Sequence, residues 1–262
     1  MTTTTFSIGR TARLTRWNAT LLARNRAAFF YATVMPLLPL ALLFAGERGD
    51  PAVGANAVTT CFLVAGLFPV YYNVLSQFVA RREELVLKRM RTGETRDNEL
   101  LLSIALPGAL CAIVICAVLV PAAWALEQPL PLNPLVYLVL SVMTVTMFTA
   151  FAYWTAAWTR SAEAAQLTSM PIIFLASLGP LFIALPGLSS TLRDVVSLTP
   201  GAAMAELVGS SWFGFDRVGA TEPTLGFAET WAAAAGPLLV MAAWTVLGLA
   251  LARRSMRWEP RT

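Results

Sequence analysis

The chain has 262 residues, of which 57% are hydrophobic and only 13% charged, whereas soluble domains carry about 25% charged residues. This charge cannot solvate a soluble protein of such size, so the composition excludes a soluble enzyme, a disordered regulator and a nucleic-acid-binding protein, despite a net charge of +4. The absence of histidine removes the commonest general base and metal ligand at neutral pH. We therefore expect an all-α integral membrane protein without a metal site or a nucleic-acid partner.

Six charge-free stretches are long enough to cross about 30 Å of hydrocarbon, which takes about 20 residues of helix. The crossing segments are predicted near residues 27–45, 56–78, 102–123, 135–158, 167–187 and 231–252. The third and fourth are separated only by Glu127, but the prolines around it favour a turn. A single transmembrane domain over residues 1–262 accounts for the whole chain. Its three cysteines lie in apolar runs and are expected to be buried free thiols.

Basic residues are concentrated in every second segment outside the predicted spans. The N-terminal segment, the second and fourth loops and the C-terminal tail hold sixteen of the nineteen basic residues. Cytoplasmic segments of membrane proteins carry such an excess, so both termini are expected in the cytoplasm, with the chain in the inner or plasma membrane. The basic segments also favour contact with anionic lipid head groups. The first apolar run follows five arginines and lacks a small-residue cleavage site, unlike a signal peptide.

No predicted span contains a charged residue, although proton relays and most ion-coupled carriers hold one within the membrane. Intramembrane proteolysis is disfavoured for the same reason. The only lysine, Lys88, has no glycine-rich phosphate loop before it, so the chain cannot hydrolyse ATP by itself. No cofactor is expected in this chain, and a pump built on it needs a separate energy source.

Two basic segments are candidates for docking such a subunit. The first, Ile8–Ala27, carries apolar residues at helical spacing and predicts an amphipathic helix at the membrane interface. Its marker residues are Arg13, Arg16, Trp17 and Arg24. The alternative is a basic arm that sets the topology and lies on lipid.

The second segment is the loop Arg81–Glu99. Glu84 and Lys88 are spaced four apart, which supports a short helix, with Leu85, Val86 and Met90 as its apolar side. Thr92–Gly93 is expected to end this helix, and Thr95 or Asp97 to cap the next one. The alternative is an ordinary solvated loop.

Three segments resemble parts of the type-2 ABC exporter permeases. Arg24–Leu40 is similar to the family's basic turn and proline-containing first span, and Glu84–Leu101 is similar to its loop between spans two and three. Leu198–Val208 resembles the outer-side helix before the last span. The drug- and antibiotic-resistance permeases of the daunorubicin-resistance type are the most similar variety.

The resemblance implies a permease that dimerises, as a homodimer, and binds two ATPase subunits, on which ATP and Mg²⁺ are held. The family's coupling element corresponds to Arg82–Arg96, and its connecting helix to Ile8–Asn25. Charge-assisted contacts to the ATPase are expected from this element, at Glu83, Glu84, Lys88, Arg89 and Arg91.

Aromatic and amide side chains in two spans are candidates for lining the path of an amphiphilic substrate. They are Tyr71, Tyr72, Asn73, Gln77, Phe148 and Phe151. Aromatic-belt and packing roles are the alternative for these residues.

The leading hypothesis is the permease subunit of an ATP-driven exporter of amphiphilic or hydrophobic molecules. A membrane scaffold that recruits a cytoplasmic partner without transport is the alternative, and an ion-coupled carrier is a third hypothesis. The identity of the substrate is not encoded in any readable motif.

Overall fold

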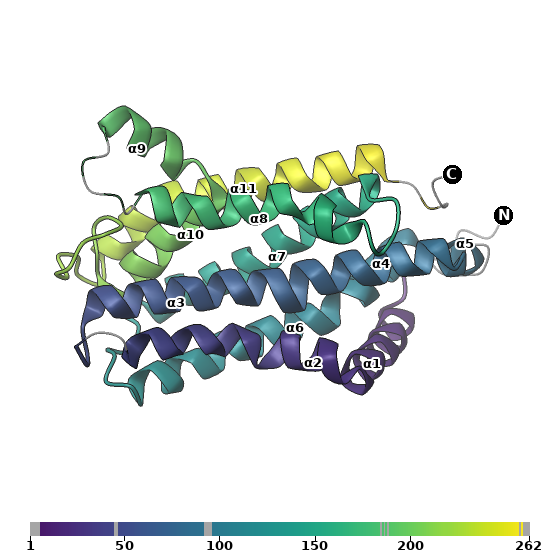
Figure 1. Ribbon diagram of the computed structural model, residues 1–262, viewed down its shortest axis with the longest axis horizontal. Helices are drawn as coiled ribbons and strands as arrows, with labels where there is room; N and C mark the ends of the chain where they lie inside the picture. The colour runs from purple at the N-terminus through teal and green to yellow at the C-terminus, as the bar shows by residue number, and fades with distance from the viewer. Residues whose placement is uncertain are drawn as a thin grey trace.

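The computed structural model describes residues 6–44, 47–91, 96–183, 185, 187, 189–256 and 258. Long helices run side by side along the longest axis of the molecule (Figure 1), and the described residues contain no strand. In chain order the elements are α1 (Ile8–Arg24), α2 (Arg26–Thr33), η1 (Met35–Phe44), α3 (Pro51–Ala65), η2 (Gly66–Tyr72), α4 (Asn73–Glu83), α5 (Val86–Arg91), α6 (Asp97–Trp124), α7 (Pro134–Trp158), α8 (Ala165–Ile183), α9 (Ser190–Ser197), α10 (Pro200–Val208), η3 (Gly209–Phe213) and α11 (Glu229–Ser255). The predicted all-α class is confirmed.

Five continuous helices are long and apolar enough to cross a membrane, and the bent pair of α2 and η1 makes six if the pair is counted as one broken span. Their positions match the predicted spans, with shifts at the ends. α7 begins one residue before the predicted 135 and ends at the predicted 158, whereas α6 extends to Asp97 and α11 to Ser255. α8 ends at Ile183, before the predicted 187. The long charged ends of α6 and α11 continue the helices past the apolar cores from which the spans were predicted.

The first span is not the continuous helix that its apolar run predicts. α2 and η1 meet at an angle of 43°, and η1 is a 3₁₀-helix that contains Pro39 and begins beside Pro36. Proline lacks the amide hydrogen that an α-helix needs in its interior, which accounts for the change of helix type. Tight 3₁₀ geometry lets the chain continue across the apolar layer without a regular α-helical ladder.

The second span is a continuous helix, Pro51–Glu83, of 33 residues. Its middle section, η2, is a π-helical segment around Pro69, and such widened turns accommodate a proline within a helix. The carbonyl oxygen of Pro69 approaches Gly108 of α6 so closely that a Cβ atom on Gly108 would lie 1.8 Å away. Only glycine permits α6 to pack this tightly against the π segment.

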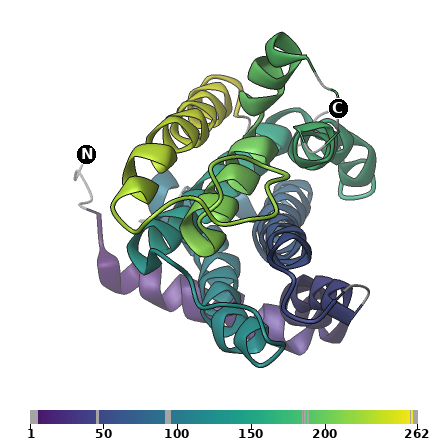
Figure 2. The same ribbon diagram turned by 90° about the vertical axis from the view of Figure 1, so that its left-hand side faces the viewer.

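The two ends of the bundle differ in structure. At one end, here called the basic end, α1 lies across the long axis of the bundle and packs against α6 (Figures 1 and 2). The same end of the bundle carries α5 and the C-terminal turns of α11. At the opposite end, here called the far end, α10 spans Pro200–Val208 and lies within Leu198–Val208, the segment that resembles the family's outer-side helix. Instead of lying on the surface, α10 is almost wholly buried and packs against α3, α7, α8 and α11.

Candidate coupling surface and substrate path

The second span reaches the basic end through a buried arginine. Arg82 is fully buried and donates hydrogen bonds to the carbonyl oxygens of Ala156, at 2.8 Å, and of Thr159. These carbonyls belong to the last turn of α7, whose terminal carbonyl groups lack partners within the helix. Arg82 therefore caps α7 and fixes the end of span two to the end of span four. From the sequence, Arg82 was predicted only as one of the basic residues of the loop between spans two and three.

The predicted short helix after span two is present, but it starts later than predicted. α4 ends at Glu83, and Leu85 has a left-handed φ of 61°, so the chain turns before α5 begins at Val86. Glu84 therefore precedes α5, and the predicted common helix for Glu84 and Lys88 is wrong. Leu85 is exposed, while Leu87 is fully buried and provides the apolar anchor of α5.

The predicted ATPase contacts lie on the outside of this turn. Glu83, Glu84, Lys88 and Arg89 are all exposed. The Glu83 carboxylate accepts a hydrogen bond of 3.2 Å from the backbone N–H of Ala162 and so links α4 to the loop before α8. Arg91 is the last residue of α5. Four of the five predicted residues thus form one charged surface at the basic end, here called the coupling surface.

The predicted helix end at Thr92–Gly93 and the predicted cap at Thr95 lie outside the described residues. The other predicted cap, Asp97, lies inside the first turn of α6. Arg96 occupies the cap position, and the Glu99 carboxylate accepts a hydrogen bond of 3.2 Å from its backbone N–H. Glu99 therefore plays the part of the third helical residue in a capping box, whose side chain accepts from the backbone N–H of the cap residue.

α1 presents its apolar side outward. Trp17 is 67% and Leu21 is 55% exposed, and Arg13, Arg16 and Arg24 are exposed as well. This arrangement fits an interfacial helix that places tryptophan and arginine at lipid head groups.

The inner side of α1 is polar and is attached to α6. Arg10 forms an ion pair of 2.9 Å with the buried carboxylate of Glu99, which also accepts a hydrogen bond from the Ser7 N–H. Further along α1, the buried Asn18 donates to the carbonyl oxygen of Ser103 at 2.6 Å. The attachment of α1 to the bundle therefore relies on hydrogen bonds with defined geometry, and its apolar side remains available for lipid.

A chain of side-chain hydrogen bonds continues from α1 into span two. Arg81 donates to the side-chain oxygens of Asn18, at 2.6 Å, and of Gln77, at 2.9 Å. Gln77 in turn donates to the side-chain oxygen of Asn73 at 2.6 Å. Asn73 directly follows the π segment. These contacts connect the interfacial helix to the irregular centre of the second span, and they use two of the residues predicted for the substrate path.

The other predicted path residues lie mostly in the core. Tyr71, Phe148 and Phe151 are fully buried. The Tyr71 hydroxyl donates to Thr155 at 3.0 Å, and the Phe148 ring packs where a Cβ atom on Gly66 would lie. Tyr72 is half-buried, with its hydroxyl 3.1 Å from that of Ser169 on α8. These side chains hold the helices together in this conformation.

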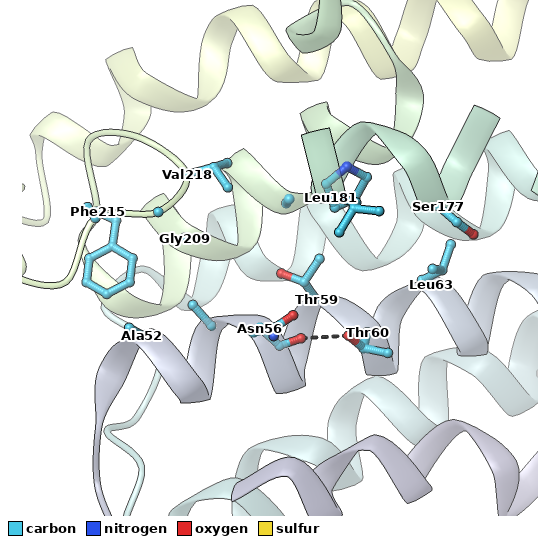
Figure 3. Close-up of a pocket in the computed structure, with 15 residues that line it drawn as sticks. Ala52, Asn56, Thr59, Thr60, Leu63, Ser177, Leu181, Gly209, Phe215 and Val218 are labelled. Atoms are coloured by element: carbon cyan, nitrogen blue, oxygen red, sulfur yellow. Dashed lines mark hydrogen bonds between the residues drawn. The ribbon is translucent and has the colours of Figure 1, made fainter. Parts of the chain in front are cut away.

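A cavity of about 410 Å³ lies nearer the far end, between α3, α8, α10 and the segment after η3. Asn56, Thr59 and Thr60 from α3 and Ser177 from α8 supply polar groups (Figure 3), and apolar residues such as Phe215 form the remaining wall. None of the six predicted path residues lines this cavity. The sequence analysis missed it because its walls come from helices far apart in the chain.

The cavity adjoins a strip of span two that the other helices cover only in part. Every fourth residue of this strip is exposed or half-buried, whereas most of the residues between them are buried. The strip, here called the open stripe, consists of Asn56, Thr60, Val64, Phe68, Tyr72 and Ser76. Its middle part also lines an apolar groove against η1. Four of its six side chains carry a hydroxyl or an amide group. A regular spacing of this kind at sequence level is the signal that would have identified the stripe.

Comparison with known families agrees with this architecture. The family described as "ABC-2 family transporter protein" matches residues 25–254, a range that begins just before α2 and ends in the last turn of α11. No curated protein sequence matches the chain. Because the family match extends from the first span to the last, this chain belongs to the ABC-2 family of transporter permeases, the membrane-spanning subunits that work with a separate ABC ATPase.

Proposed function

We propose that this chain is the permease of an exporter that moves amphiphilic or hydrophobic molecules, such as drugs, antibiotics or lipid-like compounds, out of the cell. Two copies form a homodimer, and two ATPase subunits bind at the coupling surface, where they supply ATP and Mg²⁺. The basic end and both termini then lie in the cytoplasm, and the far end lies outside.

The open stripe is the observation that carries this proposal. Asn56 and Ser76 are exposed on the protomer surface within a 33-residue apolar helix. Polar groups facing lipid are costly in a membrane and are tolerated where they line a water-containing cavity or face protein. In Figure 1 the second span crosses the front of the molecule between α8 and the η1 segment. A second copy facing this surface would enclose the stripe between two protomers and so create a path with mixed polar and apolar walls.

The coupling surface supports the proposed energy source. Lys88 and Arg89 of this surface lie on α5, which Leu87 anchors in the core. Glu83 is the last residue of α4, which Arg82 joins to α7. A force applied to α5 is therefore transmitted to the ends of spans two and four. The hydrogen-bond chain through Arg81 and Gln77 gives α1 a connection to the same span.

Docking is tested with the double variant Glu84→Ala/Arg89→Ala. The complex of permease and ATPase is purified and reconstituted in liposomes, and ATP hydrolysis is measured with and without the permease. We expect the wild-type permease to stimulate hydrolysis and the double variant to lose most of this stimulation. Unchanged stimulation in the double variant would contradict the assignment of the coupling surface.

The path is tested with Thr60→Val, which replaces a hydroxyl by a methyl group of similar volume. Thr146→Val is its matched control, because both hydroxyls bond the carbonyl four residues back, and Thr146 lies exposed on α7, away from the stripe. Uptake of a fluorescent amphiphile into inside-out vesicles is measured after ATP addition. Thr60→Val should change the concentration of the amphiphile that gives half-maximal uptake, and Thr146→Val should leave this concentration unchanged. An ATPase that binds the permease without any ATP-dependent uptake would favour the scaffold instead.

A further inference from the structure

A second cavity, of about 230 Å³, lies at the far end beside the cavity of Figure 3. The two cavities share Val218 as a wall residue. They also lie on either side of the last turn of α10, where Ala205 lines the first cavity and Glu206 lines the second. The two cavities therefore adjoin each other across Val218 and this turn.

The second cavity is lined by charged groups from three parts of the chain. Arg193 and Asp194 come from α9, Glu206 from α10, and Asp216 and Arg217 from the segment after η3. Asp216 and Arg217 are exposed and pair with each other at 3.7 Å. Three carboxyl groups face two guanidinium groups, which leaves an excess of negative charge in the cavity.

Glu206 is the carboxyl group best placed to bind a ligand. It is half-buried, and it forms no hydrogen bond or ion pair with any residue that the structure describes. Burial raises the pKa of Glu206 to about 7, because a desolvated carboxylate loses its hydration without gaining a partner. A cation that enters the cavity would supply that partner.

Helix α9 forms one wall of this charged cavity. Its apolar residues Leu192 and Val195 are 55% and 59% exposed, while Arg193 and Asp194 line the cavity. Figure 1 shows α9 standing off the bundle at the far end. The helix therefore turns charged residues toward the cavity and leaves apolar residues uncovered, the reverse of a surface helix in a soluble protein.

We propose that the two adjoining cavities bind an amphiphile that carries a protonated amine, with its apolar body between α3, α8 and α10 and its ammonium group at the Glu206 carboxylate. This inference rests on the proposed function, since it names the chemical class of the substrate. The positive charge of Arg193 repels the ammonium group and weakens its binding. Removing the charge of Glu206 should therefore weaken amine binding, and removing the charge of Arg193 should strengthen it.

The test uses two fluorescent probes that share one aromatic body. Dansylcadaverine ends in a primary amine, and its N-acetyl derivative ends in a neutral amide. Their dissociation constants are measured by fluorescence on the purified complex of permease and ATPase. Glu206→Gln, which keeps the size of the side chain, should raise the dissociation constant of the amine about tenfold, the loss expected for one charge-assisted hydrogen bond. The acetylated probe should change less than twofold. Arg193→Gln should tighten amine binding.

The pH dependence provides a second readout that needs no variant. Protonation of Glu206 removes its charge, so amine binding to the wild type should weaken as the pH falls from 8 to 6. The other charged groups lining the cavity are Arg193, Asp194, Asp216 and Arg217. Glu206→Gln retains all four, so in this variant the pH effect should disappear.

Three results would overturn the inference. The first is an equal rise in the dissociation constants of both probes in Glu206→Gln. The second is weaker amine binding in Arg193→Gln, and the third is amine binding to the wild type that does not change with pH. Each leaves the proposed exporter intact if ATP still drives uptake of the acetylated probe. Failure of the wild-type complex to move either probe, or any other amphiphile, in response to ATP would instead refute the proposed function.

Discussion

At the scale of single residues, buried and strained positions at the basic end have the clearest consequences. Arg82 is the largest charged side chain that the structure buries completely, and both carbonyl partners named above lie at the end of α7. Hydrogen bonds to charged groups contribute about 1.5–3 kcal/mol each, and the buried carbonyls lose their partner when the guanidinium is removed. Arg82 therefore stabilises the folded bundle, in addition to contributing a positive charge at the basic end.

Replacing Arg82 by Gln should destabilise the protein by about 2 kcal/mol or more, because Gln cannot reach both carbonyls. For a chain of this size that corresponds to a fall in Tm of about 4–8 °C in detergent. Arg253→Gln, on the exposed end of α11, is the control and should leave Tm unchanged. Equal Tm values for the two variants would show that Arg82 does not hold α7.

Leu85 provides a second prediction at this scale. Its φ of 61° is costly for a residue with a Cβ atom, by about 1–2 kcal/mol, and costs little for glycine. Leu85 is also exposed, so its side chain contributes little packing. Leu85→Gly should therefore have a higher Tm than Leu85→Ala, which keeps the strain. The reverse order would mean that the turn between α4 and α5 does not adopt this conformation.

At the scale of elements, the contact of α6 with the π segment of span two depends on a single glycine. A Cβ atom at Gly108 would lie 1.8 Å from the Pro69 carbonyl oxygen, so the two helices must separate to admit it. Close approach of helices through small residues is a general feature of packing within membranes. The separation would also disturb Asn73, whose amide nitrogen would lie 2.9 Å from the new methyl group.

Gly108→Ala should accordingly lower stability by about 1–3 kcal/mol. Gly9→Ala in α1 is the matched control, because the nearest atom outside its chain neighbours and its own helix backbone lies 3.9 Å from the position of its Cβ atom. Since alanine favours helix more than glycine does, the control should be neutral or up to about 1 kcal/mol more stable. Thermal unfolding of the two variants in the same detergent checks both signs. A tolerated Gly108→Ala would contradict the tight contact.

At the scale of the whole molecule, the concentration of basic residues at one end predicts the orientation in the membrane. In a variant whose three native cysteines are replaced by alanine, single cysteines are introduced at Glu222 and at Arg253, both exposed and at opposite ends of the chain's bundle. A membrane-impermeant thiol reagent should label Glu222→Cys in intact cells. It should label Arg253→Cys only after permeabilisation. Labelling in the opposite order would reverse the predicted topology.

Sequence patterns predicted the elements better than their contacts. Charge-free runs located the spans, because the cost of moving charge into hydrocarbon restricts composition whatever the fold. A helix at α10 was also expected, from the resemblance of Leu198–Val208 to the family's outer-side helix. Pro36 and Pro39 are a local signal for the break in span one. The late start of α5 was not predicted, because it depends on a left-handed residue, Leu85, that hydropathy does not detect.

By itself, the sequence determined that the chain is an all-helical membrane protein, that it lacks an ATP-binding loop, and that its basic segments lie on alternate loops. These properties follow from composition and from the order of residues along the chain. Only the tertiary structure decided which residues line cavities and which are packed in the core. Asn56 and Glu206 line cavities, while Tyr71 and Phe148 are buried, although all four lie in apolar helical segments. The reason is that a helix has several faces, and the neighbours that cover each face come from distant parts of the chain.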